Sequence, residues 1–431
     1  MVALLELPTE VVCAIAEFLP GNSLFSFRQT CQGINTKTRG IFECAYFQTR
    51  YVMFERQSLD ILKAISEHPS LRHAVRTLGL CIEHLSKSEM NKLRYADCPL
   101  QVHGDEIPPY FEDSVAQHCL VQAMRKLPNC KTLVLTDAHV PWGSVRLQKE
   151  AGCVLERGLE TDFLRGGFVQ YLLNVMLTAA VESKLPVEKL DIYLGHMDEP
   201  NCVQPISVSL LDVPLTQDKP APARLNLATL TSLRLILCPY PGDSKGPRWE
   251  PAFDRFLAMF PQLSHFTLAF DGEEQYDHHD IFPRLSKAIS IPKLRVVEFA
   301  RLEATVSELA EVLVRHRQTL EEATLRDVKL RGIGSWPFLL NILRNMFGVR
   351  RVTMKNCLIE DEWIRDHCDD MPDIVCITDQ RTYANVVGWI EEATDWMLKE
   401  GHEEFSAIDP AVQNPSYLQL LLSETGGLVG Q

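Results

Sequence analysis

Apolar side chains recur every three or four residues between Leu5 and Val52, which predicts three short helices. The first helix begins near Pro8, a residue that suits a first helical turn because its missing N–H is not needed there. Its apolar positions are Leu7, Val11, Val12, Ile15, Phe18 and Leu19. A helix that is apolar over most of its circumference needs two surfaces to cover it, its own domain and something else.

Two further helices follow this first one. Pro20-Gly21-Asn22 predicts the end of the first helix, and Ser23 is placed to cap the second helix. The apolar side of the second helix consists of Leu24, Phe27, Cys31 and Ile34. The third helix is expected from about Thr38 to Tyr51. About 45 residues in three short helices make a thin core, and so small a domain is usually marginal alone.

A six-residue pattern recurs along the rest of the chain, with apolar residues at its first, fourth and sixth positions. The copies are Val75–Leu80, Cys130–Leu135, Val187–Ile192, Leu230–Leu235, Leu263–Leu268, Leu294–Phe299, Leu320–Leu325 and Val349–Met354, with a weak ninth at Met371–Cys376. From Leu230 onward the copies begin 26 to 33 residues apart. A repeat of this length is typical of leucine-rich repeats, in which each copy forms a strand with its alternating apolar pair in the core.

Helices are predicted between the later strands, at Pro251–Phe260, Val306–Arg317 and Trp336–Met346. One repeat cannot bury its own apolar face, so stacking must supply the core. The pattern therefore favours an irregular α/β solenoid over an unrelated α/β domain. A helix with Leu59, Leu62 and Ile65 on one side, capped by Ser58, is expected to link the first three helices to the repeats.

Long insertions separate the early copies, and a different composition follows the last one. The insertions are Leu85–Asp113, His139–Arg165, Asp198–Arg224 and Tyr240–Pro251. Such loops often carry the binding function of repeat proteins, but they can equally be without a specific role. A helix that closes the repeat domain is predicted at Tyr383–Lys399. The Gly-rich end from about Glu424 is expected to be disordered.

The first 50 or so residues resemble an F-box. The resemblance rests on Leu7, Pro8, Glu10, Val11, Ile15, Leu19, Leu24, Phe27, Arg28 and Cys31. One departure is Ile34, at a position where family members often carry Trp. The remainder is similar to the leucine-rich C-terminal halves of many fungal F-box proteins. The expected fold is thus mixed, α+β or α/β: an N-terminal three-helix F-box followed by an irregular leucine-rich-repeat-like α/β solenoid.

The resemblance gives a domain plan and a function. The plan is an F-box at 1–55, a linker helix at 56–70, repeats at 71–380, an acidic helical cap at 381–420 and a disordered tail at 421–431. The family implies binding of a Skp-type adaptor, which joins an F-box protein to a cullin–RING ubiquitin ligase. The implied adaptor-binding residues are Leu7, Pro8, Val11, Val12, Ile15, Leu19, Leu24, Phe27 and Cys31.

The repeats would then capture a target protein that the sequence does not identify, as the substrate receptor of an SCF-type ligase. Two alternatives stay open: a non-degradative F-box scaffold in another assembly, and an ordinary three-helix subdomain packed on its own chain. The cytoplasm and/or the nucleus is the expected location, because the cysteines, 13 in number, are scattered without any C-x-x-C motif.

Charge argues against a nucleic-acid partner. The net charge is −14, and residues 357–431 hold 16 acidic side chains against Arg365, Arg381 and Lys399. The rest of the chain is almost balanced, with 40 basic and 41 acidic side chains, and shows no basic face for phosphates. No membrane span is expected either, because the best candidate, Val169–Val181, is short and contains Gln170 and Asn174.

Catalytic and metal-binding motifs are missing from the sequence. It contains no G-x-S-x-G, P-loop, G-x-G-x-x-G or H-E-x-x-H pattern. The best metal-like cluster, His278-His279-Asp280, has no second ligand set at useful spacing, and His196 with Asp198 is no better. We therefore expect no cofactor, no metal and no catalytic residue, so that any ubiquitin transfer belongs to partner subunits.

Overall fold

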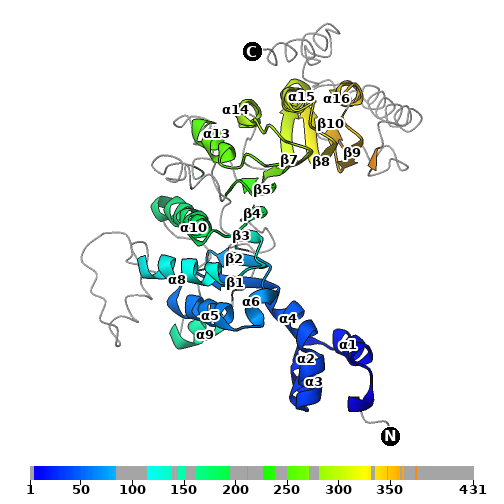
Figure 1. Ribbon diagram of the computed structural model, residues 1–431. Coiled ribbons are helices and arrows are strands. Elements are labelled where there is room, and N and C mark those ends of the chain that lie inside the picture. Colours follow the sequence, from blue (N-terminus) through cyan, green and yellow to red (C-terminus); the bar gives the residue numbers. More distant parts are fainter. Residues whose placement is uncertain are drawn as a thin grey trace. The chain divides into compact units, whose positions relative to one another are not determined.

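The computed structural model, whose helices and strands are labelled in Figure 1, divides into two compact units. Unit 1 comprises residues 1–156 and 175–187, and unit 2 comprises residues 157–174 and 188–431. The structure describes residues 4–83, 114–137, 141, 144–151, 162–194, 211, 227–237, 250–270, 281–331, 335–346, 348–359, 362–363 and 374–375. Of the four insertions, only residues 141, 144–151, 162–165, 211 and 250–251 are among these residues, and the closing helix predicted at Tyr383–Lys399 lies outside them.

Unit 1 opens with a bundle of short helices. They are η1 (Leu4–Glu6), α1 (Thr9–Glu17), α2 (Gly21–Gln29), α3 (Gln32–Lys37) and α4 (Arg39–Phe47). The predicted second helix is in fact two helices, because the backbone of Cys31 is extended and its Sγ accepts a hydrogen bond from the Ile34 N–H at 3.5 Å. Ser23 does not cap α2, since Pro20 holds the N-cap position and α2 begins three residues earlier than predicted.

A parallel sheet follows the bundle in unit 1. It contains β1 (Thr49–Met53), β2 (Thr77–Cys81) and β3 (Thr132–Thr136), accompanied by α5 (Arg56–Glu67), α6 (Leu71–Ala74), α8 (Ser114–Arg125) and α9 (Ser144–Ala151). The strand β1 was not predicted from the sequence, where the third helix was expected to continue to Tyr51. Ser58 also has another role than helix capping: its Oγ accepts a hydrogen bond from the Met53 N–H at 3.0 Å.

Unit 2 is built on a second run of parallel strands. They are β4 (Lys189–Tyr193), β5 (Ser232–Leu237), β6 (His265–Phe270), β7 (Val296–Thr305), β8 (Glu322–Arg331) and β9 (Arg351–Lys355). Short strands complete the edge: β10 (Leu358–Ile359) beside β8, β11 (Glu362–Trp363) beside β10, and β12 (Ile374–Val375) beside β9. Each of the eight clear copies of the sequence pattern lies on a strand, from β2 to β9.

Helices alternate with these strands, as the repeat pattern predicted. They are α13 (Glu250–Ala258), α14 (Phe282–Ala288), α15 (Val306–Arg315) and α16 (Ser335–Arg344). Before them comes α10 (Asp162–Ser183), whose residues 162–174 belong to unit 2 and whose residues 175–183 belong to unit 1. The segment Val169–Val181 lies inside α10, where Leu172, Leu173 and Ala179 are fully buried, as expected of a core helix. No helix in the described part of the chain is long and apolar enough to span a membrane.

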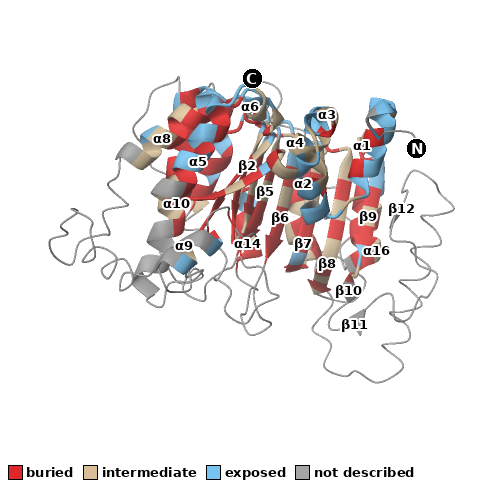
Figure 2. Cartoon of the chain, turned by 90° about the horizontal axis from the view of Figure 1, so that it is seen from below, coloured by how far each residue is buried: buried red, intermediate tan, exposed pale blue. Residues whose placement is uncertain are grey.

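The core of unit 2 consists of two rows of side chains that run from strand to strand. One row is Leu190, Leu233, Phe266, Val297, Ala323 and Val352, and the other is Ile192, Leu235, Leu268, Phe299, Leu325 and Met354. Both rows are buried (Figure 2), and α14 and α15 lie against β7 while α16 lies against β8. The expectation of a mixed fold with a parallel, solenoid-like sheet is confirmed at this level; whether the N-terminal helices form an F-box stays a prediction.

Three neighbouring strands of unit 2 share a backbone bend. Arg301, Asp327 and Asn356 have φ of 52°, 53° and 49°, and each directly follows one of three residues paired across β7, β8 and β9. Asp and Asn tolerate this left-handed conformation better than most residues. The Asn356 Nδ2 donates to the Asp327 Oδ1 at 3.0 Å. The bends therefore form a column, which we call the αL column.

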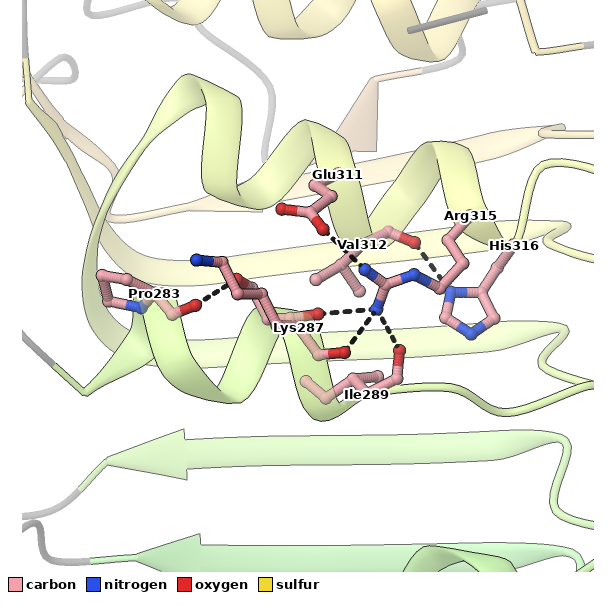
Figure 3. Close-up of polar contacts among 8 residues, drawn as sticks. Pro283, Lys287, Ile289, Glu311, Val312, Arg315 and His316 are labelled. Atoms are coloured by element: carbon pink, nitrogen blue, oxygen red, sulfur yellow. Dashed lines mark hydrogen bonds and ion pairs between the residues drawn. The ribbon is translucent and has the colours of Figure 1, made fainter. Parts of the chain in front are cut away.

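Arg315 ties α15 to the end of α14 (Figure 3). Its guanidinium Nη1 donates to the carbonyl oxygens of Ser286 and Ile289 at 2.7 Å each and of Lys287 at 3.2 Å. Its Nη2 donates to the Glu311 Oε1 at 2.7 Å. The last carbonyls of a helix have no partner inside the helix and favour a cation nearby, so this one side chain closes α14 and joins two successive repeats.

His316, next along the chain, is buried and neutral. Its Nδ1 lies 2.7 Å from the Val312 carbonyl oxygen, and its Nε2 accepts a hydrogen bond from the Ile291 N–H at 3.0 Å. An Nε2 that accepts a hydrogen bond carries no proton, so the hydrogen is on Nδ1 and is donated to Val312. The pKa of His316 is lowered to about 4, chiefly by burial; the hydrogen bond to Val312 opposes this shift, and the positive charge of Arg315 adds a smaller lowering.

Stability should therefore fall in mild acid. The pKa of a histidine is about 6.5 in the unfolded chain, so the unfolded state gains a proton first as the pH drops. The free energy of unfolding keeps its full value above pH 6.5 and falls progressively as the pH drops to 4. Between pH 7 and pH 5 this loss amounts to about 2 kcal/mol. Urea unfolding at both pH values measures it. His316→Gln should remove this difference, and an unchanged difference would show that another group titrates.

Candidate partner-binding site

Helix α1 exposes a line of large apolar side chains to solvent. Val11, Ile15 and Phe18 are spaced four and three residues apart and keep 43%, 36% and 89% of their surface exposed. We call these three residues the α1 ridge. On the opposite side of the helix Val12 and Ala16 are buried, at 0% and 1%. The helix thus has an inner apolar face that its own bundle covers and an outer one that it leaves open, as its pattern predicted.

The start of α1 is held firmly in place. Pro8, in an extended conformation, accepts the N–H groups of Val11 and Val12 at 3.1 and 3.2 Å. The Lys37 Nζ donates to the Leu7 carbonyl oxygen at 2.7 Å, and the Cys13 Sγ donates to the Lys37 carbonyl oxygen at 3.3 Å. These contacts anchor α1 to the end of α3, so the orientation of the α1 ridge is fixed by the bundle.

The structure sorts the predicted adaptor-binding residues into three groups. Pro8, Val11 and Ile15 are exposed, Leu7, Leu19, Phe27 and Cys31 are half-buried, and Val12 and Leu24 are buried. Val12 and Leu24, at 0% and 3% exposed, have no surface left for a partner and hold the helices together instead. Val12 and Leu24 therefore belong to the interior of the bundle and not to the contact surface. A helix that is apolar all round does not indicate which of its faces packs against its own domain.

A second feature of the bundle, which was not predicted from the sequence, is a hollow between α2, α3 and α4. Its volume is about 390 Å³, and its walls are Phe25, Arg28, Gln29, Cys31, Gln32, Asn35 and Phe42. Phe25 is 40% exposed at the rim, and its ring packs against Phe42 and Tyr46 at centroid distances of 5.4 and 4.7 Å. Part of the hollow was visible in the sequence, since Phe25, Arg28 and Gln29 are spaced three and four residues apart and lie on one side of α2.

Arg28 is fixed inside this hollow. Its guanidinium carbon lies 3.6 Å from the centroid of the Phe42 ring, and its Nε donates to the Asn35 Oδ1 at 3.1 Å. Its Nη2 donates to the same oxygen. Burial lowers the pKa of Arg28, Arg39 lowers it further, and Glu43 opposes the shift. The guanidinium is therefore an immobilised, partly desolvated cation.

The strands of unit 2 carry a polar row on the face opposite the buried rows. Asp191, Arg234, Thr267, Glu298 and Thr324 are paired neighbours on β4 to β8. The Thr267 Oγ1 donates to Glu298 at 3.4 Å, and the other Glu298 oxygen lies 3.2 Å from the Arg326 Nη2. Burial raises the pKa of Asp191 while Arg234 lowers it. This row is a candidate contact surface for a protein target.

The described residues give no sign of a metal centre or a reactive thiol. Among them, no group of three or more His, Cys, Asp or Glu could hold a metal ion. The His278-His279-Asp280 cluster and the His196–Asp198 pair lie outside the described part of the chain. Burial raises the pKa of Cys130 and of Cys357 to about 12, which keeps both as unreactive thiols.

Comparisons with known proteins identify no family and give structural matches with low TM-scores only. No protein-family model and no curated protein matches the chain. Among solved structures, a complex of Rad7 and Elc1 in yeast matches with 11% identity, 80% of both chains covered and a TM-score of 0.27. A hyperthermostable endo-1,4-beta-D-mannanase from Thermotoga petrophila matches with 10% identity, 81% of this chain and 99% of the other covered, and a TM-score of 0.21. TM-scores this low support no argument about function.

Proposed function

We propose that the chain is the substrate receptor of an SCF-type cullin–RING ubiquitin ligase. The observation that carries the proposal is the α1 ridge: three large apolar side chains in a row on an anchored helix whose other face is already covered. Burying a large aliphatic or aromatic side chain contributes roughly 1.5–3 kcal/mol before the costs of association are subtracted. The F-box resemblance, which includes Val11 and Ile15 of this ridge, supports a Skp-type adaptor as the partner that covers it.

Target capture is assigned to unit 2 in this proposal. Its polar row presents charged and hydroxyl side chains in register across β4 to β8, and repeat proteins bind partners through such repeated surfaces. The chain would supply binding geometry, and ubiquitin transfer would belong to other subunits, in the cytoplasm or nucleus. A non-degradative scaffold is the alternative, and it keeps the same adaptor contact; target levels that do not change when adaptor binding is lost would favour it.

A double substitution at the start of α1 tests the adaptor contact. Leu7→Ala with Pro8→Ala should weaken binding of a Skp-type adaptor about tenfold, because it removes apolar surface and loosens the first turn of α1. Titration of the full chain with the adaptor, followed by calorimetry, measures this loss.

The circular dichroism spectrum and the unfolding temperature of unit 2 should stay as in the unaltered chain. Ile61→Ala on α5 is a suitable control, because Ile61 is exposed in the same unit and lies outside the bundle. If the unaltered chain shows no adaptor binding, the proposed function is wrong.

A further inference from the structure

We propose that the hollow between α2, α3 and α4 receives a carboxylate side chain of the adaptor, held by Arg28. This inference rests on the proposed function and names the chemistry of a second contact on the bundle. It concerns other residues than the α1 ridge, since the hollow is lined from α2, α3, α4 and Cys31.

The first argument is the unused hydrogen-bonding capacity of Arg28. A guanidinium has five N–H donors, and Asn35 offers a single oxygen to two of the three nitrogens. The third nitrogen, Nη1, is shielded from water and has no hydrogen-bond partner within the described residues. A buried donor without an acceptor is costly, so an incoming acceptor would recover that free energy.

The second argument is charge. Glu43 acts on Arg28 only at a distance, and its carboxylate accepts a hydrogen bond from the Ser70 hydroxyl. Arg39 adds a second positive charge near the hollow, since it lowers the pKa of Arg28. Gln29, Gln32 and Asn35 supply further polar walls without negative charge. The hollow is thus electrostatically prepared for an anion, and a carboxylate matches the planar guanidinium best.

The third argument is rigidity. The Phe42 ring supports the flat face of the guanidinium, and Phe42 itself packs on Phe25, Tyr46 and Phe47 at centroid distances of 5.4, 5.0 and 5.6 Å. A cation that is already held in place loses little conformational freedom when it binds. The exposed edge of Phe25 at the rim adds apolar surface for the stem of an acidic side chain.

The test compares full-length chains carrying Arg28→Met or Arg28→Gln with the unaltered chain, each titrated with a Skp-type adaptor at low and at high salt. Both substitutions remove the charge, and Gln keeps a donor that can reach toward Asn35. Each should weaken binding about 10- to 100-fold at low salt, and each should make the affinity less dependent on salt. Arg76→Met, at an exposed position of unit 1 outside the hollow, should change affinity by no more than about twofold.

The outcomes separate this inference from the proposed function. If the unaltered chain binds and both Arg28 variants, still folded, bind equally well with the same salt dependence, Arg28 only joins α2 to α3 and the inference is overturned alone. If Arg28→Met unfolds the bundle, Arg28→Gln decides between the same two results. If the unaltered chain does not bind the adaptor at all, both the function and the carboxylate contact are overturned.

Discussion

Val11→Asp with Ile15→Asp should abolish adaptor binding while unit 1 stays folded. Both positions face outward from α1 and are about two-fifths exposed, so the free chain solvates the new carboxylates at little cost. In the complex the same carboxylates would be buried without partners, which costs several kcal/mol. We expect affinity for a Skp-type adaptor to fall more than about 100-fold, as measured by calorimetry or by co-purification with the full chain.

A matched control is available in the same unit. Ile61 on α5 and Val145 on α9 are also exposed aliphatic residues, and neither belongs to the bundle of α1 to α4. Ile61→Asp with Val145→Asp adds the same charge to the same unit and should leave adaptor binding unchanged. Equal losses in the two double variants would mean that net charge, and not the α1 ridge, governs the interaction.

Arg315→Met should destabilise unit 2 strongly, because Arg315 caps α14. The substitution keeps most of the apolar stem but leaves the carbonyl oxygens of Ser286, Lys287 and Ile289 without their donor. Charge-assisted hydrogen bonds contribute more than neutral ones, and we expect a loss of about 3 kcal/mol in the free energy of unfolding. Urea unfolding gives the total, and hydrogen exchange of the α14 amides gives the local part.

Arg351→Met provides the comparison for this effect. Arg351 also lies in unit 2, but its ion pair with Glu322 is 4.0 Å long and both side chains are about half exposed. Exposed pairs of this kind contribute little, so the loss should stay below about 1 kcal/mol. Similar losses for both variants would show that α14 does not depend on its cap.

The repeat strands could be predicted from sequence because their pattern is local and strict. The alternating pair in each copy, such as Val297 and Phe299, must face the core in every strand, and that requirement is visible in six residues. In register with β2, Phe47 and Val52 correspond to Val75 and Leu80, but Arg50 pairs with Leu78 and replaces the fourth apolar position of the pattern. A helical pattern also runs directly into β1. Its pairing with β2 brings Tyr51 over Gly79, where a Cβ would lie 2.4 Å from the ring. Neither segment alone predicts such a long-range fit between Tyr51 and Gly79.

The candidate site was predictable in part. The outward residues of α1 belong to the stripe recognised in the sequence, but the division into an exposed Ile15 and a buried Val12 depends on where α3 and α4 pack. Phe18, the most exposed member of the α1 ridge, was in the apolar stripe and yet outside the predicted contact set. The hollow around Arg28 needs residues from separate helices, and only the folded bundle brings Asn35 and Phe42 to it.

The αL column bears on how such a chain can change length over evolution. Because Arg301, Asp327 and Asn356 bend their strands at matching positions, neighbouring repeats present nearly interchangeable backbones to each other. Removing or duplicating one entire repeat would bring two compatible bends together, whereas gaining or losing a single residue within a strand would put a bend beside a straight segment and turn core side chains to the other face. This sheet can therefore lengthen or shorten by whole repeats without losing its core, but not by single residues within a strand.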